Sequence, residues 1–209
     1  NTFDVSLISA NPLIRRLTIE EISLIIDFAR ELGTADPVVT CHSGWPTFGA
    51  TPEETEHWLI ESLTKLSRRA SDAGVRIGME VADFFMPADK CELVAELDLP
   101  ALGITLDTGH ISFTENNIPM YERYGSIGGF IRRFASRLRH VHIHDYDGNQ
   151  DHLPIGRGEI DFQDIFAALR DIDFTGAVSL ELNSARVSRS EILESRRRIQ
   201  CLLGDERRP

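Results

Sequence analysis

The sequence lacks several features that mark particular classes of protein. No run among its 209 residues approaches the roughly 18 consecutive apolar residues that a membrane helix needs. Cysteine is scarce, with three residues and no Cys-x-x-Cys pair, so a disulfide framework is excluded and a reducing, cytoplasmic compartment is expected. Basic residues are outnumbered 22 to 33 by acidic ones, and the net charge of −11 opposes binding to a nucleic-acid backbone. We therefore expect a protein that binds neither membranes nor nucleic acid.

Helix-start signals and short apolar runs alternate along the chain. Ser or Thr followed three residues later by Glu, the capping-box pattern, occurs at Thr18–Glu21, Thr51–Glu54 and Ser188–Glu191. Helices are expected over six stretches: 18–33, 51–74, 87–97, 119–137, 162–172 and 189–203. Five apolar runs between them predict strands: Val38–His42, Arg76–Glu80, Gly103–Asp107, His140–His144 and Ala177–Glu181. Strands that alternate with helices predict βα units around a parallel sheet.

The two faces of the predicted strands differ in character. Successive side chains of a strand point to opposite faces, so Val178 and Leu180 share one face while Ser179 and Glu181 share the other. Each run repeats this pattern, with one apolar face and one face that is small, then polar, then ionisable. A barrel has one helix-covered face and an interior that opens at the strand C-termini, whereas a doubly wound sheet is apolar on both faces.

We therefore predict an α/β protein, a single TIM (β/α)8-type barrel domain over residues 1–209. Five strands are fewer than eight, so two or three N-terminal βα units are expected to be absent from this chain. The chain begins at Asn1, with neither a methionine nor an export signal, and we expect the true N-terminus to lie upstream.

Four ionisable residues stand at or near the C-terminal ends of successive strands. Glu80, Asp107, His142 and Glu181 are 27, 35 and 39 residues apart, about one βα unit each, so they are expected to converge at the barrel mouth. Three carboxylates placed together repel one another unless a cation neutralises them. Mixed carboxylate and imidazole donors suit Mn²⁺, Co²⁺, Fe²⁺ or Zn²⁺ better than Mg²⁺. The pattern thus predicts one divalent metal ion.

Longer motifs surround these four residues: Leu-Asp-Thr-Gly-His at 106–110, His-Val-His-Ile-His-Asp at 140–145, and His-Leu-Pro-Ile-Gly-Arg-Gly-Glu-Ile-Asp-Phe at 152–162. With Glu80 before them and Leu180-Glu181 after, the set resembles the xylose isomerase-like TIM barrels, and within them the sugar phosphate isomerase/epimerase group. The resemblance implies that Glu80, Asp107, His142 and Glu181 hold the metal, with Mn²⁺ the first choice. It further implies that Glu80 and Glu181 form the acid/base pair and that His42, His110 and Asp145 contact the substrate. Trp45, on a loop after a strand, is expected to stack on a sugar ring.

Such a site suits proton transfer next to a carbonyl group. Removal of that proton leaves an enediolate, whose negative charge a metal stabilises, while one carboxylate takes the proton and another returns it. Isomerisation, epimerisation and dehydration of a sugar acid or inosose all remain open. The partner expected is a small sugar-like molecule, and a homo-oligomer is compatible with the sequence. Ketose 3-epimerases of the group carry an Arg six positions after the ligand His, where this chain has Gly148, which weakens that assignment.

Two other functions compete. Zinc-dependent abasic-site endonucleases share the barrel and use a three-metal cluster, but they need an Asp-x-His pair where this chain has Gln150-Asp151-His152. The Asp is displaced by one position, which on an extended segment turns it to the other side. The second alternative is a barrel that binds a sugar or a partner chain without turning it over.

Overall fold

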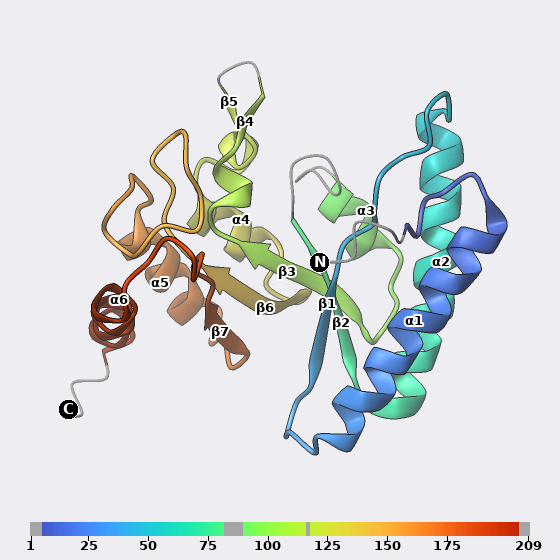
Figure 1. Ribbon diagram of the computed structural model, residues 1–209, viewed down its shortest axis with the longest axis horizontal. Helices are drawn as coiled ribbons and strands as arrows, with labels where there is room; N and C mark the ends of the chain where they lie inside the picture. The colour runs from blue at the N-terminus through green and yellow to red at the C-terminus, as the bar shows by residue number, and fades with distance from the viewer. Residues whose placement is uncertain (1–5, 82–89, 116–117, 205–209) are drawn as a thin grey trace. The chain divides into compact units, whose positions relative to one another are not determined.

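The computed structural model describes residues 6–81, 90–115 and 118–204 (Figure 1). Contacts along the chain divide it into two units, residues 1–105 and 106–209, and each unit is described by itself. The assignment of one domain to residues 1–209 stays a prediction. Among the described residues, no helix combines the length and the apolar character needed to cross a membrane.

The first unit is a parallel sheet with helices on it. Its elements are α1 (Pro12–Glu31), β1 (Val38–Cys41), α2 (Pro52–Ala73), β2 (Arg76–Glu80), α3 (Lys90–Glu96) and β3 (Leu102–Asp107), whose last two residues enter the second unit. Strand β2 pairs in parallel with both β1 and β3, and Gly78 lies opposite Thr40 on one side and Gly103 on the other. The strands predicted here are confirmed to within one residue at each end.

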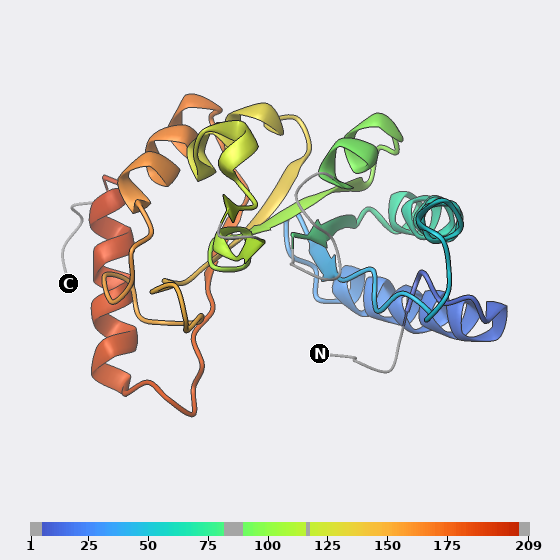
Figure 2. The same ribbon diagram turned by 90° about the horizontal axis from the view of Figure 1, so that it is seen from above.

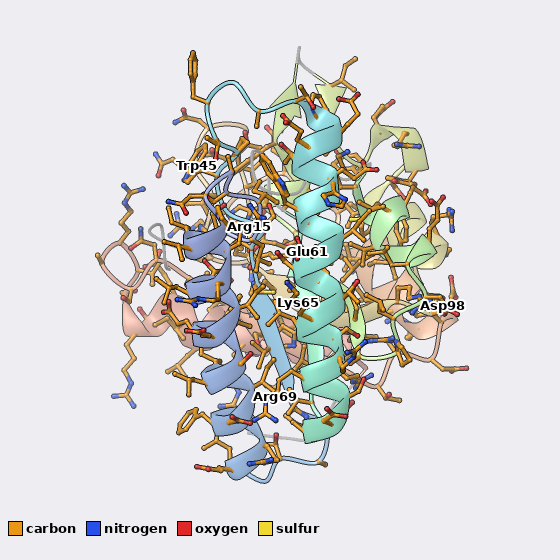
Figure 3. All side chains as sticks on the ribbon, turned by 90° about the vertical axis from the view of Figure 1, so that its right-hand side faces the viewer. Arg15, Trp45, Glu61, Lys65, Arg69 and Asp98 are labelled. Carbon is orange, nitrogen blue, oxygen red and sulfur yellow. The ribbon has the colours of Figure 1, made fainter. Side chains whose placement is uncertain are left out.

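Helices α1 and α2 lie side by side along the sheet (Figure 3). Their facing surfaces bury Ile22 and Ile26 of α1 against the apolar stripe of α2, which includes Leu59, Leu63 and Leu66. Arg69 of α2 pairs with Asp27 of α1, and this hydrogen bond lowers the pKa of the Asp27 carboxyl. Burial of the apolar stripes supplies most of the stabilisation, because exposed ion pairs contribute little.

Two capping boxes were predicted in this unit, at Thr51 and at Thr18, and the structure confirms the first of them. Thr51 forms the expected capping box with Glu54, and Gly74 ends α2 in the left-handed conformation (φ 67°), so both ends of that helix are confirmed. The prediction at Thr18 is wrong, because α1 begins earlier, at Pro12, with Asn11 as its N-cap. Thr18 lies inside the helix, where its hydroxyl donates to the Ile14 carbonyl and accepts the Ser6 N–H. A Pro at the first helical position proved the better signal.

The second unit continues from β3 into the remaining strands. Its elements are η1 (His110–Ser112), β4 (Thr114–Glu115), β5 (Ile118–Pro119), η2 (Glu122–Tyr124), α4 (Ile127–Arg133), β6 (Leu138–Ile143), α5 (Phe162–Asp171), β7 (Ala177–Leu180) and α6 (Arg189–Leu202). Strands β6 and β7 pair in parallel, with His142 opposite Ser179. The helix expected over 119–137 is wrong in its first half, because β4 and β5 form an antiparallel hairpin and Gly125 separates η2 from α4.

Helices α4 and α5 pack together, and α5 also contacts α6 (Figure 2). Asp164 of α5 accepts a hydrogen bond from the N–H of Gly128 in α4, and Arg132 pairs with Asp171. The Ser188–Glu191 capping box opens α6 as predicted. Beneath the helices, the apolar strand residues Leu106, Val141 and Ile143 are fully buried, as their alternation indicated.

Candidate functional site

Two of the predicted site residues, His42 and Glu80, lie together in the first unit. Glu80 is the last residue of β2 and is 5% exposed, and His42 follows β1 directly. The His42 Nε2 atom is 3.5 Å from Glu80 Oε2. Parallel pairing of β1 with β2 brings these strand ends to the same edge of the sheet. Trp45, in the loop after β1, is 46% exposed, so its indole presents a surface to solvent.

A buried thiol lies beneath this pair. Cys41 is the last residue of β1, and its Sγ atom lies 3.5 Å from Met79 Sδ. Burial, together with the nearby Glu80 carboxylate, raises the pKa of the Cys41 thiol to about 12. Because only the thiolate is nucleophilic, this cysteine is expected to be inert at neutral pH.

Cysteine accessibility gives a direct check of this packing. Cys41 and Cys91 are buried, whereas Cys201 on α6 is exposed. We expect iodoacetamide at pH 8 to label one thiol of the native chain quickly and the other two at least about 100-fold more slowly. Mass spectrometry of intact protein counts the adducts, and unfolding in guanidinium should make all three thiols reactive. Fast labelling of three thiols in the native state would contradict the buried position of Cys41.

Asp107 is the centre of the second unit's cluster. It ends β3, is fully buried, and its two carboxylate oxygens have different neighbours. Oδ1 accepts the backbone N–H of His110 at 2.8 Å and lies 2.8 Å from Nε2 of His144. Oδ2 faces two imidazole nitrogens, Nδ1 of His110 at 3.6 Å and Nδ1 of His142 at 3.8 Å.

His142 and Glu181 meet beside Asp107. His142 lies on β6 with its Nδ1 atom 2.8 Å from Oε2 of Glu181, which follows β7. The Glu181 backbone is fixed by its N–H, which donates to the carbonyl of Ile143 at 3.1 Å. His140 is the other histidine on this face of β6, and its Nε2 atom pairs with the hydroxyl of Ser179 at 2.9 Å. The second unit therefore brings Asp107, His142 and Glu181 together.

Three residues that the sequence prediction did not select complete the cluster: His144, Asp151 and His152. The ring of His152 stacks on that of His144, with centroids 4.1 Å apart and planes 10° apart. Its Nδ1 atom lies 3.2 Å from Asp151 Oδ1, and its Nε2 atom lies 3.9 Å from Glu181 Oε1. The alternating histidines of the 140–145 motif placed His144 on the face of His140 and His142, which was the available signal.

The expected direction of Asp151 is wrong. The segment is not extended there, because His152 adopts a left-handed backbone conformation (φ 54°), which is uncommon for a non-glycine residue. Asp151 Oδ2 consequently lies 3.8 Å from Nε2 of His110, on the side of the cluster. His110 is thereby flanked by Asp107 and Asp151.

Asp145, which was expected to contact the substrate, is surrounded by backbone N–H groups of its own loop. It is 1% exposed, and its two oxygens accept four backbone N–H groups, from Tyr146, Gly156, Gly158 and Ile160. A Cβ atom on Gly158 would lie 2.2 Å from the Tyr146 carbonyl oxygen, so only glycine fits this close approach. Asp145 therefore holds the 146–160 loop, and we propose that role for it in place of the substrate contact expected from the sequence.

The donor set of the second unit fits a divalent transition metal. Ligand atoms from Asp107, His110, His144 and His152 all lie within 4.8 Å of one another, and Asp107, His142 and Glu181 present a carboxylate, an imidazole nitrogen and a second carboxylate. Oxygen and imidazole donors in this mixture suit Mn²⁺, Co²⁺, Fe²⁺ or Zn²⁺. The buried Asp107 carboxylate is also more stable beside a cation than alone.

Comparison with known proteins gives consistent matches. The sequence profile of the xylose isomerase-like TIM barrels matches residues 1–202. An uncharacterized protein of Methanocaldococcus jannaschii is 33% identical over 208 residues, which cover 91% of this chain and 66% of that protein. A ketose 3-epimerase of Arthrobacter globiformis is 28% identical over 195 residues, covering 88% of this chain and 61% of the enzyme.

Comparison with solved structures gives the same family of folds as comparison of sequences. The crystal structure of a D-tagatose 3-epimerase-like protein superposes with a TM-score of 0.80 at 27% identity, covering 96% of this chain and 74% of that one. The chain spans about two-thirds or less of the length of the two relatives above. These matches confirm the predicted TIM-barrel-type fold.

Proposed function

Because the chain belongs to the xylose isomerase-like TIM barrel family, we propose that it serves a divalent-metal-dependent isomerase or epimerase that acts on sugar-like carbonyl compounds. The observation that carries this proposal is the meeting of Asp107, His142 and Glu181 at the ends of β3, β6 and β7. Active sites of such barrels lie at the C-terminal ends of the strands, where these three residues stand. The names of the relatives, several of them sugar 3-epimerases, support the same class of reaction.

We assign the metal ligands in two steps. In the second unit, Asp107 would hold the ion through Oδ2, His142 through Nδ1 and Glu181 through Oε2, the atoms that face one another. Glu80 is proposed as the fourth ligand on the strength of its place in the sequence motif, at the end of β2. Mn²⁺ is the first choice, and Co²⁺, Fe²⁺, Zn²⁺ and Mg²⁺ are alternatives.

The chemistry proposed is proton transfer at a carbon next to a carbonyl group. When bound, the metal supplies positive charge that stabilises the negative charge developing on oxygen. Glu181 and Glu80 are the carboxylates proposed to take and return the proton. His110, whose ring lies between Asp107 and Asp151, is proposed to contact a substrate hydroxyl, and His42 and Trp45 are proposed to contact the substrate from the first unit.

The position of Gly148 bears on the substrate. Gly148 lies in an exposed turn with a left-handed backbone (φ 88°), where an arginine would be strained. The position at which free-ketose epimerases carry an Arg is therefore a glycine suited to its turn in this chain. We propose a substrate other than the free ketoses, with dehydration of a sugar acid or inosose as the alternative reaction on the same site.

Metal analysis and isotope exchange on the purified chain test the proposal. We expect about one divalent metal ion per chain by mass spectrometry, and deuterium uptake from D₂O at a carbon next to the carbonyl of at least one member of a panel of ketoses, aldoses, keto-sugars and inososes. The chelator-treated chain is the control, and it should lose the exchange. Loss of water from the compound would assign dehydration instead. Three zinc ions with cleavage of abasic DNA, or no metal and no exchange, would overturn the proposal.

A further inference from the structure

A cavity of the second unit contains none of the cluster residues in its walls. Its volume is about 460 Å³, a size typical of small-molecule pockets. Its walls come from the loop after β3, from the loop after β6 and from the first residues of α4 and α5. Because Asp107 ends β3 and His142 lies near the end of β6, the cavity and the cluster lie at the same end of these strands.

Ring contacts connect this cavity with the cluster. The Phe113 ring lies 5.3 Å from the ring of His110 and 5.3 Å from the ring of Tyr146, measured between centroids. Tyr146 is part of the cavity wall. A small molecule that touches Tyr146 in the cavity would therefore lie two ring contacts away from His110, the residue that we propose to contact the substrate.

Carboxylates line the cavity. The acidic residues are Glu159, Asp161 and Asp164, and none of the described residues in the wall is Lys, Arg or His. Asp161 caps the N-terminus of α5. Asp164 accepts the Gly128 N–H at 2.8 Å and lies 3.5 Å from Nη1 of Arg132. These contacts compensate part of the charge of Asp161 and Asp164, and the wall as a whole repels anionic groups.

Glu159 supplies the negative charge that remains. It is exposed, and within the described part of the chain its carboxylate takes part in no hydrogen bond or ion pair. Its backbone is fixed, because its N–H donates to the Tyr146 carbonyl at 2.9 Å and the neighbouring Gly158 N–H donates to Asp145 at 2.8 Å. The loop therefore holds Glu159 and Tyr146 in one wall before a ligand binds, which lowers the ordering cost of binding.

Two tyrosine rings, those of Tyr121 and Tyr146, complete the recognition surface. Both residues are partly buried, and among the described residues neither hydroxyl has a hydrogen-bond partner. The face of a tyrosine ring attracts cations, and an ammonium group donates three hydrogen bonds, which carboxylate and phenol oxygens accept. Aromatic rings combined with an uncompensated carboxylate thus suit a protonated amine better than a neutral hydroxyl group.

We propose that this cavity binds the protonated amino group of an amine-bearing, sugar-like substrate whose carbonyl end lies at the cluster. Glu159 is the counter-ion of the amine, and Tyr121 and Tyr146 contact it with their rings. The inference rests on the proposed function, because it treats the amine as part of the molecule that reacts there. It adds a substrate class, the aminated sugars, and excludes sugars that carry a phosphate at this end.

Three hexoses that differ in one group test the charge preference. 6-Amino-6-deoxy-D-glucose, D-glucose and D-glucose 6-phosphate carry an ammonium, a hydroxyl and a phosphate group on the same carbon. We expect the amine to bind roughly 10-fold more tightly than glucose, because charge-assisted hydrogen bonds are about twice as strong as neutral ones, and the phosphate to bind more weakly than glucose. Backbone amide NMR of the full chain, prepared with Mg²⁺ as a diamagnetic metal, gives the dissociation constants and should show the largest shifts at Tyr146, Gly148 and Glu159.

Variants of the cavity wall locate the preference. Glu159→Gln should lower the affinity for the amine to that for glucose and leave the affinity for glucose within about twofold. Glu159 is exposed, so this variant is expected to fold. Tyr121→Phe keeps the ring and should weaken amine binding less than Tyr121→Ala does. Glu31→Gln makes the same chemical change on α1 of the first unit and should bind all three hexoses as the unsubstituted chain does.

The outcomes distinguish this inference from the proposed function. Equal affinities of the unsubstituted chain for the three hexoses overturn the inference, and so does an amine preference that survives in Glu159→Gln. Deuterium exchange on the metal-loaded chain, with aminated carbonyl sugars and their neutral parents, tests the link to the reaction, and exchange that favours the neutral sugars overturns the substrate class. Amine binding that depends on Glu159 without exchange of any sugar overturns the proposed function and the substrate role, and leaves an amine-binding pocket.

Discussion

Replacement of Glu181 with Gln is expected to lower the rate of solvent-deuterium exchange by about 10³-fold and to deplete the purified chain of metal. A positioned acid or base contributes about 10²- to 10⁴-fold to such rates, and a neutral amide cannot take a proton. The substitution also removes the negative charge 2.8 Å from Nδ1 of His142, where the metal is proposed to bind. Metal content and deuterium uptake, measured on one preparation, check both parts.

A matched control separates these effects from a general loss of charge. Glu122 is exposed on η2, so Glu122→Gln makes the same chemical change away from the cluster. We expect Glu122→Gln to keep its metal and its exchange rate within about twofold, because exposed charges interact weakly in water. Full metal content together with full exchange in Glu181→Gln would remove Glu181 from the site.

Replacement of Asp145 with Ala is expected to lower the free energy of unfolding of the chain by about 3–5 kcal/mol. The variant loses the acceptors of four backbone N–H groups in a region where the carboxylate is 1% exposed, and groups left unsatisfied there carry a desolvation cost. For a chain of this size the loss corresponds to a fall in melting temperature of roughly 10 °C. Thermal unfolding followed by circular dichroism measures it.

Asp147 provides the control for this prediction, since it lies in the same loop but is exposed. Its carboxylate accepts the N–H groups of Asn149 and Gln150 in a turn, so Asp147→Ala should cost about 1 kcal/mol or less. The loss of stability in Asp145→Asn should be smaller than in Asp145→Ala and larger than in Asp147→Ala. The amide keeps one acceptor oxygen but turns its NH₂ group toward two of the backbone N–H donors. Similar melting temperatures for Asp145→Ala and Asp147→Ala would show that Asp145 does not hold the loop.

Much of the fold could be predicted from the sequence because its signals are local. The capping boxes at Thr51 and Ser188 and the positions of the strands are properties of short segments, and these predictions are confirmed. The alternation of faces is visible in β1, whereas β3 is buried throughout and β7 is partly exposed on both faces. Thr18 failed because Ser, Thr and Glu also occur within helices, where a Thr hydroxyl can bond the preceding turn. The first half of the 119–137 stretch failed because η2 and the positive-φ Gly125 precede α4, which begins only at Ile127.

The site residues also fall into those that local sequence signals could predict and those that they could not. Strand ends set one βα unit apart indicated Asp107, His142 and Glu181, and the structure brings these three together in the second unit. Asp151 and His152 were missed because their convergence depends on one left-handed residue, His152, which nothing in the Gln-Asp-His segment reveals. His144 was missed although the alternation of the 140–145 motif placed it on the face of His142. The assignment of Glu80, Asp107, His142 and Glu181 to the metal stays a prediction.

The hydrogen bonds of Asp145 also make the loop between β6 and α5 modular. They clamp the loop at Tyr146 and again at Gly156, Gly158 and Ile160, and a bridge between Asp145 and Leu153 ties its middle. Residues 147–150 project beyond this clamp as an exposed turn. Because the clamp does not depend on the turn, a foreign peptide inserted after Gly148 is expected to leave His142 and His144 in place. Evolution can therefore exchange this turn, and with it the surface beside the site, while the proposed metal ligands stay fixed.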